Sequence, residues 1–74
     1  VYVVNDRDVL VGRVSLKDLV LSDARKVVSD ICERDITSVE TYFSDLEVAD
    51  IMRKYDLESV PVVNVQGQLV GRIT

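Results

Sequence analysis

The fold is decided by the stretch VPVVNVQGQLVGRIT, residues 60–74, because the chain contains it twice. A near copy, VYVVNDRDVLVGRVS, fills residues 1–15 at an offset of 59 (60 minus 1), with eight of fifteen aligned positions identical. The identical pairs are Val1/Val60, Val3/Val62, Val4/Val63, Asn5/Asn64, Leu10/Leu69, Val11/Val70, Gly12/Gly71 and Arg13/Arg72. Such a repeat indicates one supersecondary unit used twice. It also predicts that this chain is a piece of a longer protein that starts and ends within repeats.

Each copy has the pattern of a β-hairpin. Residues 1–4 are β-branched or aromatic, residues 5–8 (NDRD) are typical of a turn, and residues 9–14 form the return strand. In the second copy the strands are expected at residues 61–65 and 69–73, around a turn at residues 65–68.

Two capping boxes predict where helices begin. Ser15 and Asp18 open a short helix over residues 16–23, and Ser44 and Glu47 open a longer one that ends near residue 55. The longer helix carries apolar side chains at three- and four-residue spacing: Val48, Ile51, Met52 and Tyr55.

Between these helices the sequence predicts a polar connection at residues 22–26, a helical turn at 27–32 and a short strand at 36–39. The fold class is therefore α+β, with small mixed sheets and flanking helices. The expected order is strand–strand–helix, followed by strand–helix–strand–strand.

Composition narrows the function classes. The 74 residues carry a net charge of −4, from 13 acidic and 9 basic side chains, which argues against a nucleic-acid partner. The single cysteine, Cys32, excludes an intramolecular disulfide, and the lack of histidine removes the commonest catalytic base. No apolar run approaches the ~18 residues of a membrane span. We therefore expect a binding module and not an enzyme.

Three segments, SVPVVN…GQLVGRIT, GRVSLKD and SDICERDITSV, resemble the CBS domain, whose motifs come in tandem pairs that pack about a pseudo-two-fold axis. The resemblance implies a CBS-domain pair fragment. Residues 1–26 would be the C-terminal half of a first motif plus linker, and residues 27–74 a second motif without its last helix.

GRVSLKDLVLSD and KYDL-x-SVPVV are further similar to the cytosolic CBS module of MgtE-type magnesium transporters. This resemblance implies a soluble fragment of an inner-membrane Mg²⁺ channel, lying at the cytoplasmic face. Its partners would be the transmembrane and N-terminal domains of that protein. Flux would be gated by Mg²⁺-dependent domain closure.

The segment from Gly12 to Asp18 fits the CBS pattern G-x-x-S/T-x-x-D. The resemblance implies that ATP or another adenine nucleotide binds here, with Ser15 and Asp18 at phosphate and ribose. The adenine side would come from Thr37, Leu57 and Glu58. The alternative is that Ser15 and Asp18 only cap a helix.

Carboxylates around the 44–55 helix are candidate Mg²⁺ ligands, because Mg²⁺ prefers carboxylate oxygen and keeps several waters. The resemblance implies a contact from Asp56 and from the carbonyl of Arg53, with Asp45 and Glu47 nearby. The resemblance places the other Mg²⁺ ligands after Thr74 or in another domain. The alternative is a solvated acidic helix start, favoured by the helix dipole.

Two other functions stay open: a ligand-free CBS dimerisation scaffold, and an adenosyl-nucleotide-sensing module of another protein. A homodimer is expected whichever of the three functions holds, because several apolar side chains of the hairpins would lack an intrachain cover. They are Val1, Val3, Val9, Val11 and Leu69.

Overall fold

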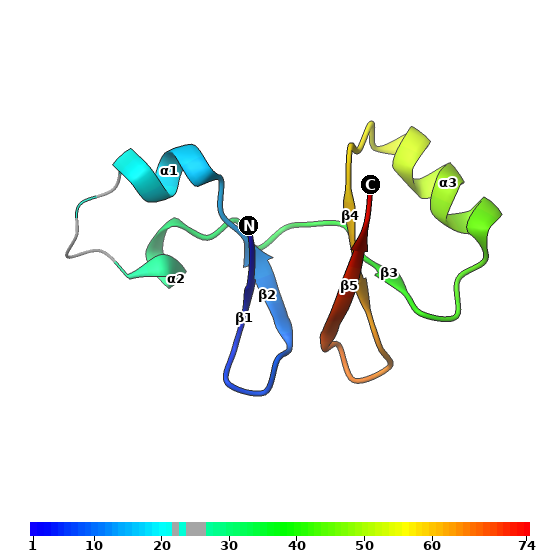
Figure 1. The fold of residues 1–74 in the computed structure, drawn as a ribbon, viewed down its shortest axis with the longest axis horizontal. Helices are drawn as coiled ribbons and strands as arrows, with labels where there is room; N and C mark the ends of the chain where they lie inside the picture. The colour runs from blue at the N-terminus through cyan, green and yellow to red at the C-terminus, as the bar shows by residue number, and fades with distance from the viewer. Residues whose placement is uncertain (22, 24–26) are drawn as a thin grey trace.

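Two hairpin-based units stand side by side in the computed structural model, which describes residues 1–21, 23 and 27–74 (Figure 1). The elements are β1 (Tyr2–Val4), β2 (Leu10–Arg13), α1 (Leu16–Leu21), α2 (Val28–Ile31), β3 (Val39–Glu40), α3 (Asp45–Lys54), β4 (Val60–Val63) and β5 (Leu69–Ile73). Strands β1 and β2 form one sheet, and β3, β4 and β5 form another in that order. The predicted α+β class is confirmed.

The two hairpins share register and irregularity. In β1–β2, Val3 pairs with Gly12 and Val4 with Leu10, which leaves Val11 as an extra residue. In β4–β5, Val62 pairs with Gly71 and Val63 with Leu69, which leaves Val70 extra. The repeat seen in the sequence is therefore a repeat of backbone geometry, including one bulge per hairpin.

The turns repeat as well. Asn5 Oδ1 accepts the N–H groups of Arg7 (2.8 Å) and Val9 (3.1 Å), and Asn64 Oδ1 accepts those of Gln66 and Gln68 (both 3.0 Å). Each turn then needs one left-handed residue. Gly67 supplies it in the second turn at φ 80°, and Asp8 supplies it in the first at φ 64°. Asp tolerates this conformation better than most residues.

The hairpins are joined to each other by two reciprocal backbone hydrogen bonds. The Leu10 N–H donates to the Gly67 carbonyl, and the Leu69 N–H donates to the Asp8 carbonyl, both at 2.9 Å. An isolated bridge between Val9 and Gln68 lies between them. Residues that correspond in the two repeats differ by 59 in number. Replacing each residue by its counterpart turns one hydrogen bond into the other and leaves the bridge unchanged, so the contacts lie about a pseudo-two-fold axis between the units.

The second unit holds the larger core. Helix α3 links β3 to β4, which run parallel, and Val39, Val48 and Val60 are buried between them. Around this cluster pack Phe43, Ile51, Met52, Leu57 and Val62. The capping box at the start of α3 is confirmed, because the Glu47 N–H donates to Ser44 Oγ at 3.2 Å.

Several boundaries differ from expectation. The strand predicted at residues 36–39 covers only Val39–Glu40, because extending it backwards would face Pro61, whose nitrogen has no hydrogen to donate. Strand β4 starts at Val60 and ends at Val63, and not at residue 65. Of the polar connection expected at residues 22–26, only residue 23 is described. It is not helical, so the helix expected at residues 16–23 does not reach its predicted end.

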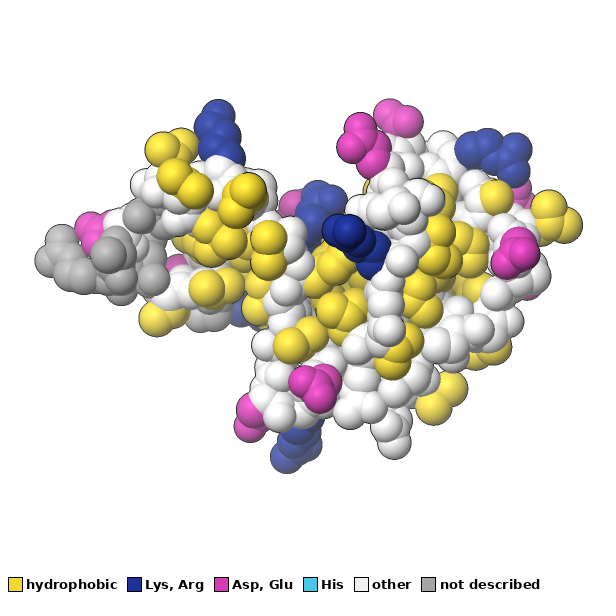
Figure 2. Space-filling view, in the orientation of Figure 1, with side chains coloured by type: hydrophobic (Ala, Val, Ile, Leu, Met, Phe, Trp, Pro, Cys, Tyr) yellow, Lys and Arg dark blue, Asp and Glu magenta, His cyan; other side chains and the backbone are white. Residues whose placement is uncertain are grey.

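Exposed apolar side chains lie at several places on the face seen in Figure 2. Of the hairpin residues expected to lack cover, Val3, Val9, Val11 and Leu69 are half-buried, because the two hairpins adjoin. Exposure is greater on α1, which buries none of its residues and presents Leu16, Val20 and Leu21 to solvent. Within the described ranges, every helix is too short or too polar to cross a membrane.

Candidate functional site

A cavity of about 220 Å³ lies between the first hairpin and the second unit. We call it the Thr37 cavity, and its lining residues are Tyr2, Arg13, Asp35, Ile36, Thr37, Tyr55, Leu57, Ser59 and Pro61. They come from three separate segments: the β1–β2 hairpin, the stretch before β3, and the α3–β4 connection together with the start of β4. Apolar walls and several hydroxyl groups suit a flat, polar-edged ligand.

A second cavity of about 450 Å³, the Glu58 cavity, shares four of these residues. It is lined by Arg13, Tyr55, Asp56, Leu57, Glu58 and Ser59. Ligand pockets typically enclose about 300–1000 Å³. A ligand larger than a single ring system in the Thr37 cavity would therefore extend into the Glu58 cavity.

The sheet register explains why the first hairpin reaches this site. Tyr2 and Arg13 are directly opposed in the β1–β2 pair, so their side chains leave the sheet on the same face. The Tyr2 hydroxyl and Ser59 Oγ lie 3.3 Å apart and link the two units across the cavity.

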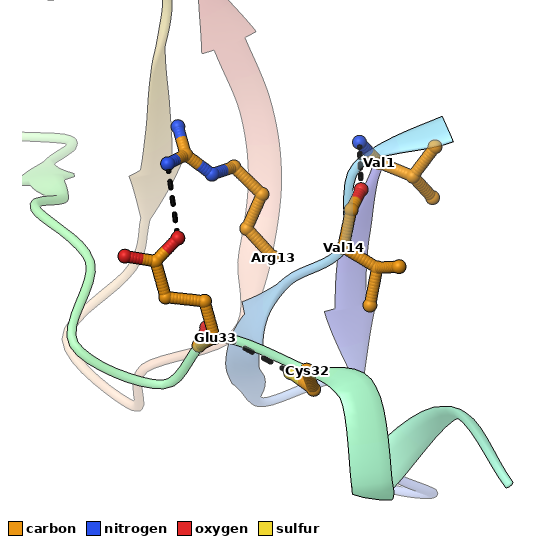
Figure 3. Close-up of polar contacts among 5 residues, drawn as sticks. All are labelled: Val1, Arg13, Val14, Cys32 and Glu33. Atoms are coloured by element: carbon orange, nitrogen blue, oxygen red, sulfur yellow. Dashed lines mark hydrogen bonds and ion pairs between the residues drawn. The ribbon is translucent and has the colours of Figure 1, made fainter. Parts of the chain in front are cut away.

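Arg13 is also tied to the segment that follows α2. The Arg13 N–H donates to the Glu33 carbonyl and the Glu33 N–H donates to the Arg13 carbonyl, both at 2.8 Å. Arg13 Nη2 and Glu33 Oε2 form an ion pair at 3.2 Å, drawn in Figure 3 with the neighbouring Cys32. In the same view the Val1 amine donates to the Val14 carbonyl at 3.0 Å, at the other edge of β2.

The predicted nucleotide residues are only partly brought together. Thr37 and Leu57 line the Thr37 cavity, and Leu57 and Glu58 line the Glu58 cavity. Ser15 and Asp18 line neither cavity; at the start of α1, the Asp18 N–H donates to Ser15 Oγ at 3.1 Å. The capping function of Ser15 is thus observed directly.

The candidate metal residues divide into two places. Asp45 and Glu47 are exposed in the first turn of α3, where Glu47 Oε1 accepts the Ser44 hydroxyl at 3.2 Å. Asp56 lies past the other end, in a left-handed conformation at φ 53°. A helix rises 1.5 Å per residue, so the two ends are roughly 15 Å apart and cannot share an ion.

Arg53 stands near Asp56 through its backbone. Its carbonyl accepts the Asp56 N–H at 3.3 Å, while its guanidinium pairs with Asp50 at 2.9 Å. Among the residues the structure describes, no three His, Cys, Asp or Glu side chains are grouped so as to hold a metal ion.

Of the nine residues that line the Thr37 cavity, the sequence predicted only Thr37 and Leu57. The seven missed residues are Tyr2, Arg13, Asp35, Ile36, Tyr55, Ser59 and Pro61. Tyr2 and Arg13 belong to the repeat, where the sequence pattern assigns them to strands. The one available signal was the predicted hairpin over residues 1–14, because residues that face each other in a hairpin place their side chains on one face.

Comparison with known proteins gives concordant matches. A profile of the CBS domain matches residues 28–74. The magnesium transporter MgtE of Thermus thermophilus is 39% identical over all 74 residues, and inosine-5'-monophosphate dehydrogenase of Nitrosopumilus maritimus is 31% identical over 97% of this chain. The chain spans only 16% and 15% of these relatives.

Two solved structures are similar over nearly the whole chain. The cytosolic domain of the Mg²⁺ channel MgtE in complex with ATP superposes with a TM-score of 0.88, at 40% identity over 99% of this chain and 29% of that one. A CBS domain pair in complex with 5-methylthioadenosine and S-adenosyl-L-methionine gives 0.75, at 27% identity over 100% of this chain and 61% of that one.

Proposed function

The chain belongs to the CBS-domain family, and we propose that it is part of the cytosolic regulatory module of a magnesium transporter. In this proposal residues 1–26 are the C-terminal half of a first CBS motif plus linker, and residues 27–74 are a second motif. The observation that carries the proposal is the pair of cavities between the two units, in a chain similar throughout to the ATP-bound MgtE domain.

We propose that an adenine nucleotide occupies these cavities. The adenine ring lies in the Thr37 cavity, against Leu57 and beside the Thr37 hydroxyl. Its ribose and phosphate leave towards Glu58 and the start of α1, where Ser15 and Asp18 contact them. Binding, and no chemical step, is the function assigned to these residues.

The test is a thermal melt of the whole chain with and without ATP. A ligand that binds only the folded state raises the midpoint. Asp18→Ala is expected to abolish the shift caused by ATP while leaving the ligand-free midpoint nearly unchanged. Asp30→Ala, which removes a first-turn carboxylate from α2 instead, is the matched control. If ATP shifts the melting midpoint of Asp18→Ala as much as that of wild type, Asp18 does not contact the nucleotide and belongs only to the start of α1.

Mg²⁺ is the proposed regulatory signal. Each end of α3 offers an exposed carboxylate, Asp45 with Glu47 at one and Asp56 with the Arg53 carbonyl at the other, and Mg²⁺ needs only one or two carboxylates per site. We propose that ions held between these ends and the neighbouring N-terminal and transmembrane domains screen acidic repulsion. The domains then close at the cytoplasmic face of the inner membrane and shut the pore, provided that Mg²⁺ binds the closed state more tightly.

The ion contact is tested with MgCl₂ against NaCl at matched ionic strength. Mg²⁺ is expected to raise the melting midpoint of the wild-type chain above the NaCl value, and Asp56→Asn to reduce that difference. Asp50→Asn, which removes a carboxylate already paired with Arg53, serves as the control. If both variants respond like wild type, Asp56 takes no part in ion binding.

A second candidate is an adenosyl-nucleotide-sensing module of another protein. The similarity to an inosine-5'-monophosphate dehydrogenase and to a CBS pair holding S-adenosyl-L-methionine favours it. The two candidate functions are distinguished by a competition experiment that measures whether the wild-type chain binds ATP or S-adenosyl-L-methionine more tightly. In both cases we propose a homodimer, formed through the exposed apolar face of α1.

A further inference from the structure

Arg13 differs from the other residues of the two cavities in its charge. Of the described residues that line them, it carries the single positive charge, while Asp35, Asp56 and Glu58 are acidic. It is also one of the four residues common to both cavities. The carboxylates on these walls repel an anionic group of a ligand, and the guanidinium of Arg13 is the charged group that attracts it.

The backbone holds Arg13 at this position. The two 2.8 Å hydrogen bonds with Glu33 fix its main chain, and the close approach of Cys32 and Glu33 requires a glycine at the preceding position, Gly12. The guanidinium is meanwhile paired with Glu33 at 3.2 Å.

This ion pair is too weak to keep the guanidinium from a ligand. The side chains of Arg13 and Glu33 are 50% and 60% exposed, and ion pairs this exposed to solvent contribute little. A phosphate offers more charge and a bidentate geometry that matches the planar guanidinium. A phosphate that reaches Arg13 therefore competes with Glu33 for the guanidinium.

We infer that Arg13 is the specificity-determining residue of this site: it selects phosphorylated adenine nucleotides over the uncharged nucleoside, and Glu33 competes with the phosphate for its guanidinium. This inference rests on the proposed nucleotide site. It adds that the ligand is negatively charged and that the Arg13 guanidinium recognises this charge.

Calorimetric titration of the whole chain with AMP and with adenosine tests the inference. Arg13→Met is expected to weaken AMP binding about tenfold, the lower end of what a hydrogen bond to a charged group contributes, and to leave adenosine binding unchanged. Arg13→Lys keeps the positive charge but loses the bidentate geometry of the guanidinium, so its affinity for AMP should lie between those of wild type and Arg13→Met. Glu33→Gln should tighten AMP binding roughly two- to fivefold, the equivalent of an exposed ion pair.

The repeat offers a matched control. Arg72 occupies the same position in the second hairpin but lines neither cavity, so Arg72→Met should bind both ligands like wild type. Asp6→Asn controls for the change in net charge in Glu33→Gln. Equal losses of AMP and adenosine affinity in Arg13→Met, or no loss of either, would overturn the inference. Binding of adenosine without any preference for AMP in wild type would overturn it too. Binding of neither ligand by wild type would overturn the proposed function itself.

Discussion

Gly12 and Gly71 hold the same place in the two repeats but have different surroundings. A Cβ atom on Gly12 would run into the Glu33 carbonyl and the Cys32 sulfur, whereas a Cβ on Gly71 would meet no atom of the described chain within 4 Å. The need for glycine at residue 12 thus comes from the segment after α2 that pairs with Arg13, and not from the hairpin itself.

Alanine at these two positions should therefore have unequal effects. Gly12→Ala is expected to lower the free energy of unfolding by about 1–3 kcal/mol, because the backbone of residue 33 must move away. Gly71→Ala should stay within about 0.5 kcal/mol of wild type. Urea unfolding followed by circular dichroism measures both, and comparable losses would mean that the close approach at Gly12 is not rigid.

Part of the candidate site could be predicted residue by residue, and part could not. Thr37 and Leu57 were predicted from a family pattern, and both line the Thr37 cavity. Tyr2 and Arg13 were not, because their position depends on how one hairpin docks against a unit about 59 residues away. No local spacing in the sequence encodes that docking.

At the scale of the elements, the two capped helices differ in how much they contribute. Ser44 Oγ and Ser15 Oγ each accept one backbone N–H, at 3.2 Å and 3.1 Å. Helix α3 packs Val48 into the main core, whereas α1 buries none of its residues. Loss of the cap should matter more where the helix carries core side chains.

Ser44→Ala is accordingly expected to lower the free energy of unfolding by about 1 kcal/mol. Ser15→Ala should leave the urea midpoint nearly unchanged, because fraying of α1 uncovers no core. A Ser44→Ala midpoint equal to that of wild type would show that α3 does not depend on this cap.

The elements themselves were largely predictable, because turns and helix caps are determined by residues that lie within about four positions of one another. Asn5 and Asn64, for example, bond only two and four residues ahead. The exception is the stretch 36–38, which alternates like a strand but stops short at Pro61 of a distant strand. Strand limits of this kind are set by the partner, not by the strand.

For the molecule as far as the structure describes it, exposed apolar side chains lie on the hairpins, with Val65 at 82%, and on α1, where three of them share one short helix. Val20 is 74% exposed in a helix without a buried side chain, and Leu16 and Leu21 are exposed beside it. Exposed apolar side chains gathered on one helix favour association of two copies, and a symmetric dimer closes the surface on itself.

Val20→Asp should shift the chain from dimer to monomer in light scattering at micromolar concentration. Leu46→Asp, on α3 and equally exposed at 75%, is the control and should leave the dimer intact. A wild-type chain that scatters as a monomer, with unfolding independent of concentration, would contradict the dimer.

The reciprocal bonds between the hairpin tips have a consequence for the order of folding. Each hairpin closes between residues about ten apart, an event of microseconds, while Leu10 and Gly67 must meet across most of the chain. Contacts between residues far apart in sequence form late, because closing the long loop between them costs conformational entropy before the contacts contribute any stabilisation. Both hairpins should therefore form before the joint does, and the Thr37 cavity, which lies between the first hairpin and the second unit, should be completed only after these two parts of the chain have docked.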